Sequence, residues 1–300
     1  MIACDLGSNT LRIARFDCQT RRRTACFERI VRTAKDLHVN RAIAPESQER
    51  LFAALHEASL HFDFRNEPCF AVTTQAMRMA SNAREILSRI ETTFGICFEI
   101  ISGEKEAALT SLAVEHALTR EGFDASCYVL FDLGGGSTEI TFCNTTSKES
   151  RSFPFGIVTT TERYASIDAS HIDRIVSVIE LFVVQHQPVV SRYRQLIATA
   201  GTPTTVAAFK QGMDYAHYDA NAINGTSLHV NDFEEAFVRL SRMPIEEATR
   251  FTGTNRRDSM IAGILLVKTI MQKLGFATCI VIDDSLREGV AIANCNTSSV

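Results

Sequence analysis

The sequence lacks an excess of basic residues: 35 acidic side chains outnumber 31 lysines and arginines and leave a formal charge of -4. A protein that holds a long nucleic acid needs a positive field that releases counterions, so we expect no nucleic acid as partner. Long apolar runs are absent too, because Lys268 interrupts even the stretch GILLVKTIM. No run approaches the ~20 residues of a membrane span, so we also expect no membrane contact.

Paired cysteine motifs are also missing. The nine cysteines are odd in number and widely spaced, and they form no CxxC pair, which argues against a disulfide framework. The opening MIACDLGSNT has an acid at Asp5, where a secretory leader needs basic and then apolar residues. We therefore predict reduced core thiols in a soluble, cytoplasmic protein.

Several common catalytic motifs do not occur. The eight histidines form no HxH, HxxxH or HExxH group, which disfavours a dedicated zinc site. No GxSxG elbow is present, and no GxxxxGK[ST] loop, which removes the commonest class of nucleotide hydrolase.

What the sequence does contain is the alternation typical of a mixed α/β protein. A hydrophobic content of 45% in 300 residues is enough for one large or two moderate cores. Apolar patterning predicts strands and then helices in each half of the chain. The expected strands are 1–6, 11–16 and 25–31, forming an antiparallel meander, followed by 69–74, 97–101, 128–133, 138–143, 150–155 and 278–282. The expected helices are one beginning at Pro45, then 83–90, 102–118, 170–187, 203–210, 231–241, 257–273 and one beginning at Leu286.

The polar segment TREGFDAS at 119–126 is the expected hinge, so we predict domains at 1–124 and 125–300. Each domain contains an acid at a strand end followed by a glycine-bearing turn and a second strand. These echoes are Asp5 with 6–10 and Asp132 with 133–138, which indicates a duplicated fold with two facing halves.

A turn rich in glycine and hydroxyl residues exposes backbone N–H groups that hold phosphate oxygens. Asp5 and Asp132 would repel phosphate directly, so we expect them to hold a divalent cation, with Glu139 supporting the cation or a water.

Glu106 lies in the first turn of a predicted helix and is a candidate for activating water. Arg78 is a candidate phosphate clamp, and eight bases against four acids in residues 1–40 suggest a local polyanion surface.

At these motifs the chain resembles the exopolyphosphatase and guanosine pentaphosphate phosphohydrolase (Ppx/GppA) family. That family belongs to the superfamily of actin-like, hexokinase-like and Hsp70-like ATPase domains. The resemblance implies a two-lobed, duplicated ribonuclease H-like fold with the active cleft between its lobes. It covers essentially the whole chain through DLGSNT (5–10), the T-x-x-x-R segment 74–78, ISGEKEA (101–107), FDLGGGSTE (131–139), TAGTPTT (199–205) and DDSLREG (283–289).

The resemblance also implies a role for each motif residue. Glu106 is the general base, Arg78 clamps phosphate, and Asp132 and Glu139 act in catalysis by holding Mg²⁺ or the water, with Asp5 as a further metal ligand. Arg32 matches a basic residue at the substrate mouth, although Ala34, Lys35 and Asp36 replace its usual neighbours. The implied phosphate-binding residues are Gly7, Ser8, Asn9, Thr10, Arg32, Gly134, Gly135, Gly136, Ser137, Thr138, Gly201 and Thr202.

The expected reaction releases terminal orthophosphate from inorganic polyphosphate or from guanosine pentaphosphate, the second of which would link the protein to the stringent response. These two substrates share their terminal group, so the sequence ranks neither, and guanosine tetraphosphate is product or regulator. Longer relatives add helical domains that form a polyphosphate channel, so we do not expect processive action on long chains. The resemblance leaves a homodimer open.

Two other functions remain open from the sequence alone. One is an ATP-dependent phosphotransferase of the acetate or sugar kinase kind, because those enzymes share the duplicated turns. The other is a non-catalytic sensor that binds alarmone nucleotides. Glu106 in its hydrolase-like context disfavours the first, and the complete set of carboxylates disfavours the second.

Overall fold

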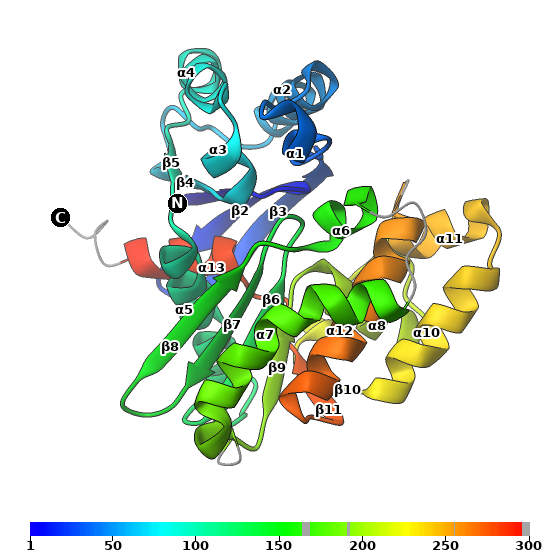
Figure 1. The fold of residues 1–300 in the computed structure, drawn as a ribbon. Coiled ribbons are helices and arrows are strands. Elements are labelled where there is room, and N and C mark those ends of the chain that lie inside the picture. The colour runs from blue at the N-terminus through cyan, green and yellow to red at the C-terminus, as the bar shows by residue number, and fades with distance from the viewer. Residues whose placement is uncertain (164–168, 191–192, 255, 296–300) are drawn as a thin grey trace. The chain divides into compact units, whose positions relative to one another are not determined.

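The structure is a computed structural model that describes residues 1–163, 169–190, 193–254 and 256–295 (Figure 1). The chain forms two compact units: unit 1 is Met1–Val114 with Asp284–Val300, and unit 2 is Glu115–Asp283. This division differs from the predicted domains in two ways. Helix α5 (Gly103–Arg120) runs unbroken through the change of unit, and the end of the chain returns to unit 1.

Unit 1 contains a five-stranded sheet in the order β3-β2-β1-β4-β5. The first three strands form the predicted antiparallel meander, and β4 and β5 continue the sheet parallel to β1. Strands that are parallel in one sheet end at the same edge, so the segments after β1, β4 and β5 gather there. The strands are β1 (Ile2–Leu6), β2 (Thr10–Asp17), β3 (Arg22–Ile30), β4 (Cys69–Thr73) and β5 (Phe98–Ile100).

Helices cover both faces of this sheet. α13 (Leu286–Asn294) packs on β1, β2 and β4, where Leu286 and Val290 meet Ala3 and Val72 in one apolar cluster. Figure 1 shows α2 and α4 on the opposite side of the sheet from α13. The remaining helices of this unit are α1 (Leu37–Asn40), α2 (Pro45–Ala58), α3 (Gln75–Met79), α4 (Ala83–Phe94) and the first part of α5.

Unit 2 repeats this topology with one strand added. Its order is β10-β11-β9-β6-β7-β8, in which β6, β7 and β8 form an antiparallel meander and β9 and β11 continue parallel to β6. The central strand thus has equivalent neighbours in both units, which confirms the predicted duplicated α/β fold. The strands are β6 (Tyr128–Leu133), β7 (Thr138–Cys143), β8 (Lys148–Phe153), β9 (Leu196–Thr199), β10 (Thr226–His229) and β11 (Thr278–Val281).

The helices of unit 2 pack largely around α12 (Arg257–Leu274), which contacts α6, α7, α8 and α10. A separate aromatic cluster joins the meander to α7, since Phe182 lies 5.4 Å from Phe142 and 5.8 Å from Phe153 between ring centroids. The other helices are α6 (Ile157–Arg163), α7 (Ala169–Val190), α8 (Gly201–Lys210), a 3-10 turn (Tyr215–His217), α9 (Ala220–Ile223), α10 (Val230–Arg242) and α11 (Ile245–Thr252).

The elements that the sequence did not predict are short. β9 and β10 have four residues each, and α1, α3, α6, α9 and α11 have four to eight. Hydrophobic periodicity needs a longer window to separate a helix from a strand. Tertiary packing, not local pattern, therefore defines these segments.

The prediction of reduced core thiols is wrong for two cysteines. Cys18, beyond the end of β2, and Cys295, beyond the end of α13, form a disulfide that connects residues 277 apart. Cys26 and Cys97 are exposed, not part of the core. This pairing could not be predicted from the sequence, because only the fold brings two cysteines so far apart along the chain together. No helix in the described part of the chain has the length and apolar character needed to cross a membrane.

Candidate functional site

The two glycine-bearing turns have the same backbone hydrogen bond. In unit 1 the N–H of Gly7 donates to the carbonyl of Thr10 at 2.9 Å, and in unit 2 the N–H of Gly134 donates to the carbonyl of Ser137 at 3.0 Å. Each turn joins two antiparallel strands, β1 to β2 and β6 to β7. The sequence echo therefore corresponds to matching local geometry.

The carbonyl groups of residues 7–9 in the first turn all accept hydrogen bonds from a single neighbouring segment. Each carbonyl of residues 7–9 accepts a hydrogen bond of 2.8 to 2.9 Å from the segment 31–34. The donors are Thr33 Oγ1 and the N–H groups of Val31, Arg32 and Ala34. Because the carbonyls are occupied by these hydrogen bonds, the N–H groups of the turn are the polar groups that can bind an anion.

Arg32 lies in that segment, and its backbone N–H donates to the Asn9 carbonyl of the turn. Its backbone has a φ of 51°, in the left-handed region, and the same is true of Asp36 at 54°. Such a conformation costs a non-glycine residue about 1–2 kcal/mol, and local strain of this kind gathers at functional loops. The tight path of residues 31–36 is thus maintained by its hydrogen bonds to the turn.

The second turn is held by the start of α6. The N–H groups of Ile157 and Val158 donate to the carbonyls of Gly134 and Gly135 at 3.0 and 2.8 Å. This close approach needs a glycine at position 156, because a Cβ there would lie 2.5 Å from the Gly134 oxygen. Both turns therefore have their carbonyls bound by a following segment, and both are suited to bind phosphate through N–H groups.

Two carboxylates pair across the meander of unit 2. Asp132 on β6 stands opposite Glu139 on β7, so both side chains lie on one face of the sheet. Glu139 is 3% exposed and accepts a hydrogen bond of 2.6 Å from Ser152 Oγ. Like charges at such a cross-strand position repel each other, and a cation between them would remove that cost. The pair fits Mg²⁺, which takes one or two carboxylates together with waters and phosphate oxygens.

The equivalent position in unit 1 is different. Asp5 is buried and pairs across β1 and β2 with Arg12, so a guanidinium replaces the second carboxylate. Arg12 also bonds to Glu28 at 3.1 Å and to Ser285 Oγ at 3.4 Å. No group of three or more His, Cys, Asp or Glu side chains forms a metal cluster within the described ranges. Asp5 as a metal ligand therefore stays a prediction.

Glu106 and Arg78, for which the sequence predicts two different roles, are in direct contact. Glu106 is 8% exposed on α5, and its Oε2 accepts a hydrogen bond of 3.1 Å from Arg78 Nη1. The same Nη1 donates to the carbonyl of Ile101 at 2.6 Å. Arg78 follows β4 and Glu106 follows β5, so both belong to the sheet edge where the first turn begins. Unit 1 thus brings the predicted base to the same edge as a predicted phosphate turn.

The remaining predicted residues are Gly201 and Thr202 at the start of α8. They follow β9, whose Thr199 pairs with Asp132 on β6, so they too lie at the carboxyl edge of their sheet. Ala200 before them has a φ of 76°, an unusual value for a residue with a side chain. Ala200 is thus strained, Ala200 and Thr202 are buried, and the loop follows β9, the strand next to β6, from which the second turn begins.

Arg256 is a site residue that sequence reasoning missed. Its side chain is 5% exposed, and Nη2 lies 2.9 Å from where a Cβ on Gly201 would stand. Its Nε is buried and has no hydrogen-bond partner among the described residues, and the same holds for Thr202 Oγ1. A buried guanidinium at a helix start is suited to an anionic ligand. The only available signal was the pair Arg256 and Arg257 at the start of the predicted helix 257–273.

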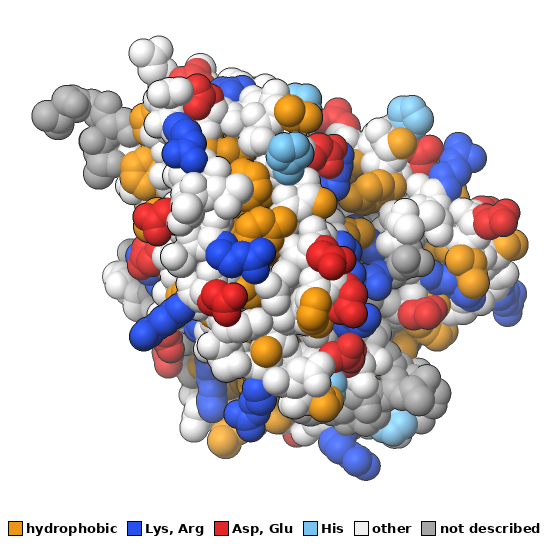
Figure 2. All heavy atoms as spheres, turned by 90° about the horizontal axis from the view of Figure 1, so that it is seen from above, with side chains coloured by type: hydrophobic (Ala, Val, Ile, Leu, Met, Phe, Trp, Pro, Cys, Tyr) orange, Lys and Arg blue, Asp and Glu red, His pale blue; other side chains and the backbone are white. Residues whose placement is uncertain are grey.

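Four of the eight bases in residues 1–40, where the sequence predicts a polyanion surface, form ion pairs within unit 1. Arg12, Arg15, Arg23 and Arg29 form ion pairs, with Glu28, Glu67, Asp284 and Glu57 as partners. Figure 2 shows basic and acidic side chains interspersed over the face it draws, without a continuous basic patch. The polyanion surface therefore stays a prediction.

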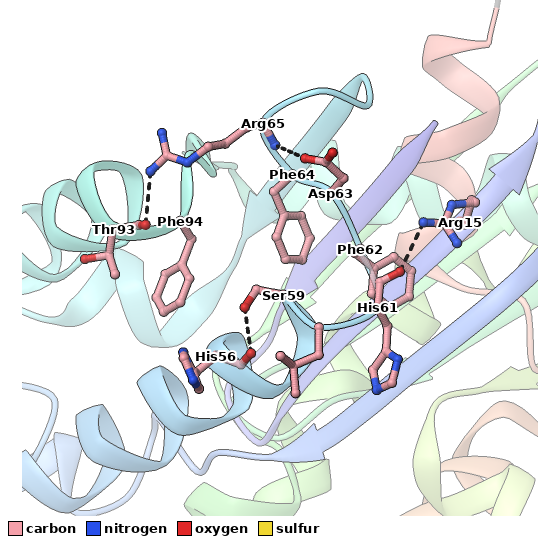
Figure 3. A pocket seen from close by; sticks show the side chains of 11 residues that line it. Arg15, His56, Ser59, His61, Phe62, Asp63, Phe64, Arg65, Thr93 and Phe94 are labelled. Atoms are coloured by element: carbon pink, nitrogen blue, oxygen red, sulfur yellow. Dashed lines mark hydrogen bonds between the residues drawn. The ribbon is translucent and has the colours of Figure 1, made fainter.

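A cavity of about 590 Å³ in unit 1 lies apart from these residues (Figure 3). Phe62, Phe64 and Phe94 form its buried apolar part, and His56 and His61 are exposed on its lining. Arg15, which lines the cavity, stands opposite Ile2 at the beginning of β1. The predicted phosphate turn follows Leu6, at the other end of that strand. It therefore contains none of the predicted site residues.

Comparison with known proteins decides the family. The profile of the Ppx/GppA phosphatase family matches residues 24–297, which is most of the chain. The chain belongs to the Ppx/GppA family. This confirms the resemblance seen in the motifs and makes the protein a member of a hydrolase family.

Individual Ppx/GppA relatives agree with this assignment. The Aquifex aeolicus family member is 26% identical, with a TM-score of 0.72 over 100% of this chain and 98% of that one. An exopolyphosphatase from Cytophaga hutchinsonii is 22% identical and shares the fold with a TM-score of 0.82, covering 98% and 97% of the two chains. A bifunctional 3-dehydroquinate synthase/phosphatase from Fusobacterium nucleatum is 26% identical in an alignment of 295 positions that covers 90% of this chain and 43% of that protein. The chain therefore spans less than half the length of that relative.

Proposed function

We propose that this Ppx/GppA protein releases terminal orthophosphate from inorganic polyphosphate or guanosine pentaphosphate. The observation that carries the proposal is the pair of turns with matching hydrogen bonds, each of which has carbonyls bound by a following segment. N–H groups presented in this way bind phosphate oxygens. A terminal phosphoryl group carries its charge on just such oxygens, and they gain charge during transfer.

Glu106 is the proposed general base. A water molecule attacks the terminal phosphorus, its proton passes to the Glu106 carboxylate, and the bond to the bridging oxygen breaks as orthophosphate leaves. The N–H groups of residues 7–10 and 134–138 bind the phosphate oxygens, with Arg32, Gly201, Thr202 and Arg256 as further phosphate contacts. Arg78 as a direct phosphate clamp stays a prediction of the sequence.

Asp132 and Glu139 are the residues that we propose to hold Mg²⁺. When bound, the ion would neutralise charge on the phosphoryl oxygens. The cross-strand carboxylates themselves contribute two hard oxygen donors on one face of the sheet, and Ser152 fixes one of them. Their shared face is the structural reason for choosing these two residues.

Phosphate release in the presence of Mg²⁺ tests the reaction, with polyphosphate and guanosine pentaphosphate at equal concentration. We expect Glu106→Gln to lower kcat by ~10² to 10⁴, because a positioned base contributes that much. Glu104→Gln is the matched control, since Glu104 lies in the same helical turn but is exposed. Its pKa is lowered by hydrogen bonds from its own N–H and from Ser102, so its carboxylate is held at the helix start. Equal release by the wild type and Glu106→Gln contradicts the role of Glu106, and transfer from ATP to an acceptor in place of hydrolysis contradicts the function.

A further inference from the structure

The guanidinium of Arg78 is nearly saturated by contacts within unit 1. Arginine has five N–H donors, and four of those of Arg78 have partners. Nη1 donates to the Ile101 carbonyl and to Glu106, and Nε and Nη2 both donate to Gln75 Oε1 at 3.2 and 2.9 Å. A phosphate clamp of the arginine type needs two parallel N–H groups. At most one remains here.

Gln75 is the residue that orients this guanidinium. It begins α3 directly after β4 and Thr74, and it lies one helical turn before Arg78, where side chains three apart are neighbours. Its Oε1 accepts both N–H groups on one side of the guanidinium, and its Nε2 lies 3.2 Å from Met79 Sδ. The amide orientation that makes these contacts places the opposite edge of the guanidinium toward Glu106.

The contact with Ile101 joins this arrangement to the start of α5. The N–H of Ile101 donates to the Thr73 carbonyl at 3.0 Å, and its own carbonyl accepts from Arg78. Arg78 thus bonds at once to the backbone before α5 and to the carboxylate four residues into it. A guanidinium fixed at three points sets the position of the carboxylate more narrowly than the rotamers of a glutamate would.

We propose that Gln75 and Arg78 are positioning residues for Glu106, so that Gln75 orients Arg78 and Arg78 orients the base. This inference rests on the proposed function for its kinetic part. Misplacing a catalytic group by about 1 Å can cost ~10² in rate. The expected loss therefore falls on kcat, because neither residue needs to contact the substrate in the ground state.

The test combines steady-state kinetics with crystal structures of the full chain. We expect Gln75→Leu to lower kcat ~10-fold and Arg78→Gln ~10²-fold, with KM within ~3-fold of the wild type in both. Gln75→Glu keeps an acceptor for both N–H groups and should restore kcat to within ~3-fold. In the crystal structure of Gln75→Leu the contact between Arg78 and Glu106, 3.1 Å in the parent, should be lost or displaced.

Gln48→Leu is the matched control, because Gln48 on α2 accepts from Arg89 at 3.3 Å in a pair that contains no carboxylate. It should leave kcat and KM unchanged. A large rise in KM for Arg78→Gln with little change in kcat overturns the proposal in favour of a direct phosphate clamp. An unmoved Arg78–Glu106 contact with unchanged kcat in Gln75→Leu also overturns it.

A failure of the proposed function can be distinguished from a failure of this inference. If Glu106→Gln retains full activity, the base assignment fails, whatever Gln75→Leu does. The crystallographic comparison needs no substrate, so it decides on its own whether Gln75 holds Arg78 against Glu106.

Discussion

At the scale of single residues, unit 2 places two acidic residues, Asp132 and Glu139, opposite each other. Glu139 is almost fully buried, and its cross-strand partner has the same charge. The hydroxyl of Ser152 satisfies one oxygen but contributes no positive charge. The corresponding cross-strand pair in unit 1, Asp5 with Arg12, combines an acidic with a basic residue. The two halves of the duplication have therefore diverged toward different chemistry at one position.

This difference predicts that Mg²⁺ stabilises the protein through Asp132. A ligand present at 100 times its Kd adds about 2.7 kcal/mol to the free energy of unfolding, so the Tm of the wild type should rise by several degrees when Mg²⁺ replaces EDTA. Asp132→Asn removes one of the two proposed carboxylate ligands and should therefore gain little from Mg²⁺. Differential scanning calorimetry measures both.

Asp124→Asn is the control for the loss of one carboxylate, because Asp124 is exposed in the loop before β6. It should keep the full response of the wild type to Mg²⁺. An equal rise in Tm for Asp132→Asn and the wild type would show that the cation binds elsewhere.

At the scale of elements, α13 is fixed to unit 1 at both ends. A capping box between Ser285 and Glu288 begins the helix, and Arg23 from β3 forms ion pairs with Asp284 and Glu288. At the other end Cys295 is bonded to Cys18. These contacts connect α13 to the hairpin of β2 and β3, so the motif DDSLREG has a structural task in addition to any role in catalysis.

The disulfide predicts a measurable dependence of stability on redox state. A cross-link that closes a loop of this length restricts the unfolded chain and contributes roughly 2–5 kcal/mol. We expect dithiothreitol to lower the Tm of the wild type by several degrees and to leave Cys18→Ser unchanged, since that variant has no bond to lose. Cys26→Ser, which removes an exposed free thiol on β3, should behave as the wild type. Identical melting of the wild type with and without reductant would contradict the prediction.

At the scale of the whole molecule, the sequence predicted most of the fold because the chain repeats itself. The strand ends at Asp5 and Asp132, the turns after them and the long amphipathic helices all follow from local pattern. The contact between Arg78 and Glu106 does not, because the parallel strands β4 and β5 bring these two residues together from distant positions. The place of Arg256 beside Gly201 does not either, because it depends on the packing of α12 against α8. The packing of α13 on unit 1 could not be predicted either, because the local pattern of residues 284–295 predicts a helix but not the sheet that it covers.

That return makes unit 1 dependent on the end of the chain, and a truncation after Asp283 tests it. Removing α13 uncovers Ala3, Phe16 and Val72 and loses the buried side chains of Leu286 and Val290. Each large apolar side chain contributes about 1.5–3 kcal/mol, and a whole domain has only about 5–15 kcal/mol to lose. We expect amide hydrogen exchange in β1, β2 and β4 to become fast, while β6, β7 and β9 keep their protection because unit 2 is one continuous segment. Unit 2 thus serves as the internal control, and retained protection in β1 and β4 would show that the sheet of unit 1 is stable without its C-terminal helix.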